Sequence, residues 1–133
     1  MNTSVQSYRD LEVWRRGREI VKSIWKLSEK LPKGELYGLT SQTRRAAISI
    51  PANIAEGWGR HYPAEFVQFL RKANGSRTEL ETHLILIEDL ELCPGMMVEP
   101  MLKELEILGK QLLTLERSLK RRMSEEKRMP NGE

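Results

Sequence analysis

The strongest pattern of apolar and polar positions lies between Leu39 and Arg60. Apolar side chains recur there at helical spacing and cover a broad arc, and only a narrow polar stripe lies opposite. This pattern predicts a helix that is buried on more than one side. Pro51 lies inside the pattern, but the arc resumes in the same phase at Ile54, so we expect a local bend and no break. The arc consists of Thr43, Ala46, Ala47, Ile50, Ile54 and Trp58.

Three further segments show helical spacing, and short turns containing Pro and Gly separate them. The first is expected to cover residues 10–31, and the third residues 63–91, without interruption at Asn74 and Gly75. The fourth is expected to begin near Glu99–Pro100. Its near-heptad repeat is typical of a bundle packed at a shallow angle. The apolar positions of this repeat are Val98, Met101 or Leu102, Leu105, Leu108, Leu112, Leu115 and Leu119.

The residues at the expected helix ends complete the prediction. Asp10 is the expected N-cap of the first helix, and Thr40 or Ser41 that of the second. Gly75 and Ser76 are expected to be small contact residues within the third helix. Four helices joined by three short turns predict an all-α, antiparallel, up-down-up-down four-helix bundle.

The composition agrees with a single domain. A chain of 133 residues is long enough to bury a core unaided, and no apolar run approaches the length of a membrane span. We expect a flexible arm at residues 1–9, the bundle at 10–123 and a disordered charged tail at 124–133. The single Cys93 permits no internal disulfide, and the N-terminus has no apolar signal region, so a cytoplasmic location is expected.

Charge is distributed unevenly, although the net charge is only +3. Residues 79–107 carry one Lys or Arg against eight Asp and Glu, whereas residues 40–78 carry six against two. In the predicted topology, the start of the first helix and the end of the fourth lie at the same pole, which therefore becomes basic. This predicted pole comprises Arg9, Arg15, Arg16, Arg18, Arg60, His61, Arg71, Lys72, Arg117, Lys120, Arg121 and Arg122. The acidic segment at the other pole comprises Glu81, Glu88, Asp89, Glu91, Glu99, Glu104 and Glu106.

Catalytic chemistry finds little support in the sequence. A di-iron bundle needs repeated Glu and His pairs, and only Glu79 and His83 approach one such pair. Cys93 lies in a turn without a nearby histidine in sequence, and no glycine-rich phosphate loop is present. We therefore expect no enzymatic activity, no metal and no cofactor.

The polar stripe of the second helix admits two interpretations. Asn53 and Glu56 could bond to Ser76 or Arg77 and fix the pairing of two helices. The stripe could instead line a ligand pocket, but its ends lie ~16 Å apart along the axis, so we favour the structural network. The predicted network comprises Arg45, Ser49, Asn53, Glu56, Ser76 and Glu79.

Two stretches, SQTRRAAISIPANIAEGWGR and AEFVQFLRKANGSRTELE, resemble a bacterial family first noticed in proteins encoded within intervening sequences of large-subunit ribosomal RNA genes. The accessory variability determinants of diversity-generating retroelements are similar to that family. The resemblance covers roughly residues 8–122, and SIPANIAEG and NGSRTELE are its most specific parts. It implies an antiparallel four-helix bundle, commonly a ring of five subunits, without known enzymatic activity. In the retroelement relatives the bundle binds nucleic acid and a reverse transcriptase.

These observations predict a homo-oligomeric scaffold or accessory protein, a pentamer by the resemblance, that binds RNA or DNA through its basic pole. Arginine dominates that pole, and its planar fork suits phosphate. The alternative is a protein-interaction adaptor without a nucleic-acid role. The residues expected to bind nucleic acid are Arg15, Arg16, Arg18, Arg60, Arg71, Lys72, Arg117, Lys120, Arg121 and Arg122.

Overall fold

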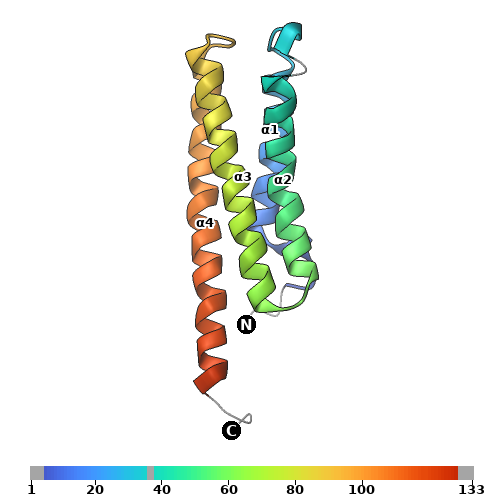
Figure 1. Ribbon diagram of the computed structural model, residues 1–133, viewed down its shortest axis with the longest axis vertical. Coiled ribbons are helices and arrows are strands. Elements are labelled where there is room, and N and C mark those ends of the chain that lie inside the picture. The colour runs from blue at the N-terminus through green and yellow to red at the C-terminus, as the bar shows by residue number, and fades with distance from the viewer. Residues whose placement is uncertain (1–4, 36–37, 129–133) are drawn as a thin grey trace.

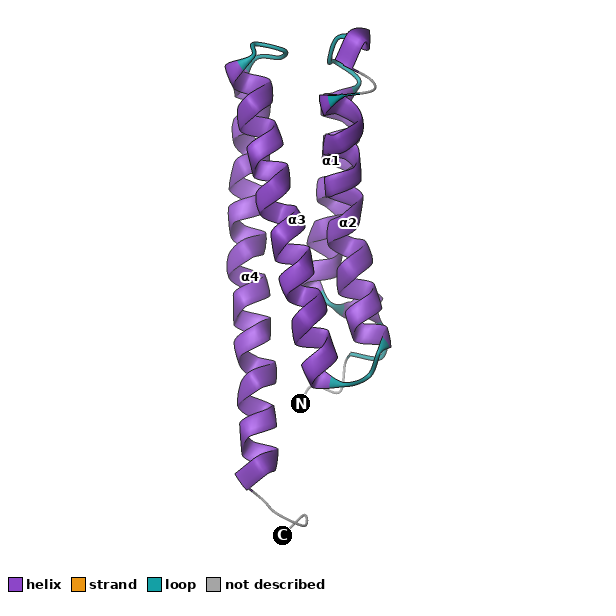
Figure 2. Cartoon of the chain, in the orientation of Figure 1, coloured by secondary structure: helices purple, strands orange, loops and turns teal. Residues whose placement is uncertain are grey.

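The structure, a computed structural model, describes residues 5–35 and 38–128. Within these ranges the chain forms helices and no strands (Figure 2). The four long helices are α1 (Glu12–Ser28), α2 (Leu39–Gly59), α3 (Pro63–Asp89) and α4 (Gly95–Arg128). Two short 3-10 helices, η1 (Tyr8–Asp10) and η2 (Lys33–Glu35), precede α1 and α2 respectively. The predicted all-α class is confirmed.

The helices form two antiparallel hairpins that pack side by side (Figure 1). One hairpin consists of α1 and α2, and the other of α3 and α4. Among the contacting pairs of long helices, α2 and α3 share the most extensive contact, and α1 and α4 share the least extensive. With 34 residues, α4 is the longest helix, and it projects beyond the turn between α2 and α3 (Figure 1). None of the described helices is long and apolar enough to cross a membrane.

A single apolar core runs along the bundle. Ile24, Ile50, Leu84 and Leu108, one from each long helix, are completely buried in it. Burial of this kind stabilises the fold by roughly 1.5–3 kcal/mol for each large apolar side chain. Of the predicted arc of α2, only Trp58 is half-buried rather than buried. In α4, Met101 is the buried member of the Met101 and Leu102 pair, while Leu102 and Leu115 are partly buried.

Helix α2 continues through Pro51, as predicted. Pro51 has no backbone N–H to donate within the helix, and α1 packs closely against α2 at this point. A Cβ atom at Gly17 of α1 would lie 3.3 Å from Ile50 and 3.5 Å from Pro51, so only glycine lets the two helices meet without displacement at this point. Helix α3 likewise continues through Asn74 and Gly75.

The predicted caps are wrong for both N-terminal helices. The N-cap of α1 is Leu11, because the Asp10 carboxylate is already engaged in η1, where it accepts from the backbone N–H groups of Gln6 and Ser7. The N-cap of α2 is Gly38, without a side-chain cap. Thr40 and Ser41 both lie inside the helix, which begins at Leu39, so neither residue occupies the cap position.

Helix α4 is longer at both ends than predicted. It begins at Gly95 instead of near Glu99–Pro100, and it continues to Arg128, so residues 124–128 of the predicted disordered tail are helical. Residues 129–133 lie outside the described part of the chain, as do residues 1–4 of the predicted arm. The prediction for Gly75 is also wrong, since Gly75 is exposed and has no neighbour within 4 Å of the position a Cβ atom would take.

Candidate nucleic-acid interface

The α2–α3 turn and the C-terminal part of α4 meet at one end of the bundle. Arg71 of α3 pairs with Glu116 of α4, and Arg122 of α4 lines a groove together with Trp58 and His61. These contacts bring together eight exposed basic side chains, which we call the basic cluster. Its members are Arg60, His61, Arg71, Lys72, Arg117, Lys120, Arg121 and Arg122.

Carboxylates neutralise only part of this cluster. Arg60 lies 2.8 Å from Glu56 and 3.3 Å from Glu65, and its hydrogen bond to Glu56 raises the pKa of this guanidinium above the ordinary value. Glu116 lies 3.0 Å from both Lys120 and Arg71. Hydrogen bonds from these two cations lower the pKa of Glu116, so it stays ionised at neutral pH.

Four members of the cluster remain available for an external anion. Lys72, Arg117, Arg121 and Arg122 form no ion pair with any carboxylate in the described part of the chain. The Lys72 ammonium lies 4.4 Å from the centroid of the Phe69 ring, which holds the charge at the surface without neutralising it.

The arginines of α1 contact groups outside this cluster. Arg16 lies 2.6 Å from Glu104 and 3.0 Å from Gln111, so it joins α1 to the middle of α4. The sequence prediction assigned Arg16 and Glu104 to opposite poles, and this assignment is wrong. Because α4 begins at Gly95 and is unusually long, Glu104 lies beside the first half of α1.

The other α1 arginines, and Arg9 before them, have local partners. The Arg15 side chain donates to the backbone carbonyl of Arg9 at 2.8 Å and lies 3.7 Å from Asp10. The Arg18 guanidinium lies 5.5 Å from the Trp14 ring centroid, and that of Arg9 lies 6.0 Å from the Tyr8 ring centroid. Leu11, at the start of α1, borders the same groove as Arg122, so the role of Arg15 and Arg18 in nucleic-acid binding stays a prediction.

The predicted polar network exists only in part. Ser76 of α3 donates to the Ser49 hydroxyl of α2 at 2.8 Å, and the Asn53 amide donates to both oxygens of Ser49. The Ser76–Ser49 bond joins α2 to α3, whereas Asn53 bonds only within α2, so the predicted bond from Asn53 to Ser76 or Arg77 is not formed. The other members lie elsewhere: Arg45 is exposed, Glu56 pairs with Arg60, and Glu79 lies 3.7 Å from His83 on its own helix.

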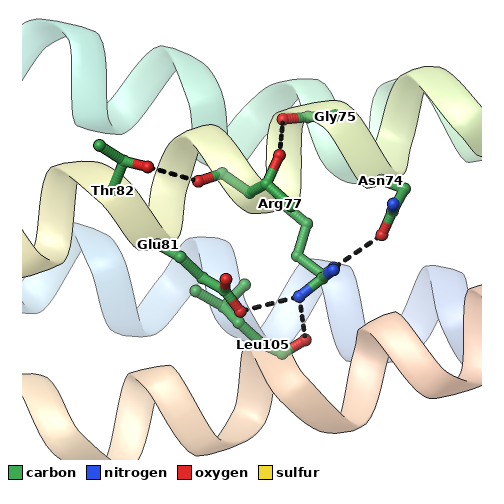
Figure 3. Close-up of polar contacts among 7 residues, drawn as sticks. Asn74, Gly75, Arg77, Glu81, Thr82 and Leu105 are labelled. Carbon is green, nitrogen blue, oxygen red and sulfur yellow. Dashed lines mark hydrogen bonds and ion pairs between the residues drawn. The ribbon is translucent and has the colours of Figure 1, made fainter.

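Arg77 turns toward α4 rather than toward α2, and the sequence prediction missed this contact (Figure 3). Its guanidinium donates to Glu81 at 2.7 Å, to the side chain of Asn74 at 2.8 Å and to the carbonyl of Leu105 at 3.4 Å. Gly109 provides the space, since a Cβ atom there would lie 2.6 Å from the Arg77 Cζ atom. The glycine within the leucine-rich α4 repeat is the sequence signal that could have indicated a side chain inserted from a neighbouring helix.

Among the described residues, no cluster of three or more His, Cys, Asp or Glu side chains could hold a metal ion. Burial, and to a lesser degree the Glu88 carboxylate, raise the pKa of the Cys93 thiol above its ordinary value. A thiol with a raised pKa is a weak nucleophile at neutral pH.

Comparison with known proteins assigns this sequence to a family. The family model described as 23S rRNA-intervening sequence protein matches residues 9–114. The chain belongs to that family. A crystal structure of a protein of unknown function from the S23 ribosomal protein family of Bacteroides thetaiotaomicron has a TM-score of 0.73 and 24% identity to it, covering 78% of this chain and 97% of the other. At this identity the likeness supports the fold alone. The search of curated proteins gave no match.

The family match covers only part of the residues described above. The matched residues 9–114 contain the Arg77 contacts and the α2–α3 turn. The cations of α4 from Arg117 onward lie beyond the matched residues. The motif NGSRTELE therefore has a structural explanation, because it supplies Asn74, Arg77 and Glu81 to the α3–α4 contact.

Proposed function

We propose that this protein is a non-enzymatic, oligomeric scaffold or accessory protein that binds RNA or DNA through the basic cluster. The observation that carries the proposal is the presence of four cations at one end of the bundle, Lys72, Arg117, Arg121 and Arg122, without a described carboxylate partner. A nucleic-acid backbone is the polyanion that such a surface suits best, because each phosphate bound releases condensed counterions.

The chemistry of the cluster favours phosphate over other anions. Arg117, Arg121 and Arg122 lie within two turns of α4 and can each present a planar fork to phosphate oxygens. Exposed guanidiniums on one helix read backbone charge and spacing rather than base edges. Affinity for unrelated sequences is therefore expected to be similar.

Assembly into a homo-oligomer belongs to the same proposal, and the resemblance stated above suggests five subunits. Exposed apolar side chains support it, among them Ile85 on α3 and Ile107 and Leu113 on α4. Ile107 lines a shallow groove of about 510 Å³ between α1 and α4, which are the least closely packed helices. Surfaces of this kind are often covered by another subunit. Light scattering should report a mass several times 15.5 kDa, and a monomer at micromolar concentration would contradict this expectation.

The test of nucleic-acid binding is a mobility-shift assay with short RNA and DNA of unrelated sequence. At ~50 mM salt the folded protein should retard both, and unlabelled competitors of either sequence should displace them equally, because backbone phosphates are the ligand. A folded protein that retards neither would leave the adaptor interpretation in place.

A protein-interaction adaptor is the second candidate, and an observation at the opposite end of the bundle favours it. Leu90 and Met96 flank the α3–α4 turn and are 60% and 80% exposed. Exposed large apolar side chains of this kind can dock a partner protein. A reverse transcriptase is the partner that the resemblance to accessory variability determinants suggests.

A further inference from the structure

An apolar groove of about 540 Å³ adjoins the basic cluster, and it is bordered by the α2–α3 turn, the C-terminal half of α4, and Val5 and Leu11 of the N-terminal segment. Phe66 and Leu119 are among the residues that form its apolar surface. Trp58, His61 and Tyr62 supply aromatic rings, and the Trp58 and His61 rings meet edge to face with centroids 5.5 Å apart. Tyr62 is 66% exposed, so most of its surface is accessible to a ligand.

The backbone holds these rings in place. His61 adopts a left-handed conformation with φ of 65°, and its N–H bonds to the carbonyl of Trp58 at 3.2 Å. The Tyr62 carbonyl accepts from the N–H of Phe66 at 2.9 Å, and Pro63 follows as the first residue of α3. The turn is therefore a hydrogen-bonded platform, which lowers the entropy cost of ordering the rings around a ligand.

Charge indicates what the groove accommodates. Arg122 is the only charged residue among the described residues that line it, and no described carboxylate lines it. Arg121 and Lys120 adjoin Arg122 on the same exposed end of α4. An occupant that is flat and apolar at its centre and anionic at its edge matches this surface. A nucleotide with an unstacked base has this character, because every base has a π-face and is followed by a phosphate.

We infer that the groove binds an unpaired nucleobase of a single strand, stacked on Tyr62, with the adjoining phosphate on Arg122. This inference rests on the proposed function and specifies its ligand, because a base inside a duplex is already stacked and cannot enter the groove without being extruded. Single strands are therefore bound more tightly than duplexes with the same number of phosphates. RNA and DNA strands share the required ring and phosphate, so the two bind alike.

The test compares the wild-type protein with the Tyr62→Ala variant on oligouridine, oligodeoxythymidine and a duplex RNA of the same phosphate count. Fluorescence anisotropy should show single-strand affinity falling by about five- to tenfold in the variant, since one stacked base is lost. Duplex affinity should change by less than about twofold, because the cations remain. Tyr62→Phe keeps the ring and should retain wild-type affinity. Met96→Ala, an exposed apolar truncation at the opposite end, should change nothing.

The outcomes separate this inference from the function on which it rests. If the wild-type protein binds duplex and single strand equally and Tyr62→Ala alters neither, the groove does not take a base, although the proposed function stands. If the wild-type protein binds no nucleic acid, the proposed function itself is wrong. If Tyr62→Ala lowers the oligomer mass in light scattering, a second copy of the chain occupies the groove and the inference is overturned.

Discussion

Replacing Lys72, Arg117, Arg121 and Arg122 together with glutamate is expected to weaken binding to RNA or DNA by about a hundredfold or more at ~100 mM salt. These cations are exposed and form no ion pair with a described carboxylate, so the substitutions remove attraction to phosphate without breaking an internal ion pair. The new carboxylates also repel the backbone. Circular dichroism should confirm that the variant is folded, and fluorescence anisotropy should give the affinity.

A matched control distinguishes the position of the charge from its amount. Lys22, Lys26 and Lys30 of the α1 region and Lys103 of α4 are also exposed, but they lie away from the basic cluster. Their joint replacement with glutamate changes the net charge by the same amount. This control should lose less than about tenfold in affinity, since long-range attraction is screened over roughly 10 Å at this salt concentration. Equal losses in both variants would mean that net charge, and not the basic cluster, governs binding.

Arg77→Met is expected to lower the free energy of unfolding by about 2–3 kcal/mol. The Arg77 side chain is only 16% exposed, and its removal leaves the Glu81 carboxylate, 27% exposed, without its partner at the α3–α4 contact. The carbonyl of Leu105 loses a donor as well. Urea unfolding at a fixed protein concentration measures the change, because assembly would otherwise shift the midpoint.

The double variant Arg77→Met with Glu81→Leu provides the check on this mechanism. It removes the unpaired charge together with its partner, so it should be more stable than Arg77→Met alone. A double variant that is less stable than the single one would contradict this mechanism, because it would show that the unpaired Glu81 carboxylate does not cause the loss. Neither variant should alter nucleic-acid affinity, because Arg77 lies outside the basic cluster.

Periodicity was sufficient to predict the helices but not their ends. The apolar positions keep the same helical spacing on both sides of Pro51 in α2, and of Asn74 and Gly75 in α3. Both helices are continuous there, because tertiary burial outweighs the local cost of a proline or glycine. Helix ends depend on competition between local hydrogen bonds. Asp10 is a good N-cap by residue type, but its carboxylate accepts hydrogen bonds from the backbone at the start of η1 instead. The periodicity of apolar residues gives no information on this alternative.

The position of the basic cluster could be predicted where chain topology alone determines it. The α2–α3 turn and the end of α4 must share one pole in an up-down-up-down bundle, and they do. The assignment of Arg16 and Glu104 to opposite poles is wrong. A correct assignment requires the axial position of α1 relative to α4, which depends on where α4 begins. The aromatic groove was missed because it depends on the left-handed backbone of His61 and on the overhang of α4.

The salt dependence of nucleic-acid affinity tests the central claim most directly. Log affinity for duplex RNA plotted against log salt should be linear, with a slope of about −3 or steeper for the wild-type protein, because each neutralised duplex phosphate contributes roughly −0.9. The slope should become shallower by about three when Lys72, Arg117, Arg121 and Arg122 are replaced, and it should hardly change in the lysine control. Two results for a folded, assembled wild-type protein would contradict the proposal that the basic cluster binds a nucleic-acid backbone. One is an affinity that is independent of salt, and the other is the absence of nucleic-acid binding at ~50 mM salt.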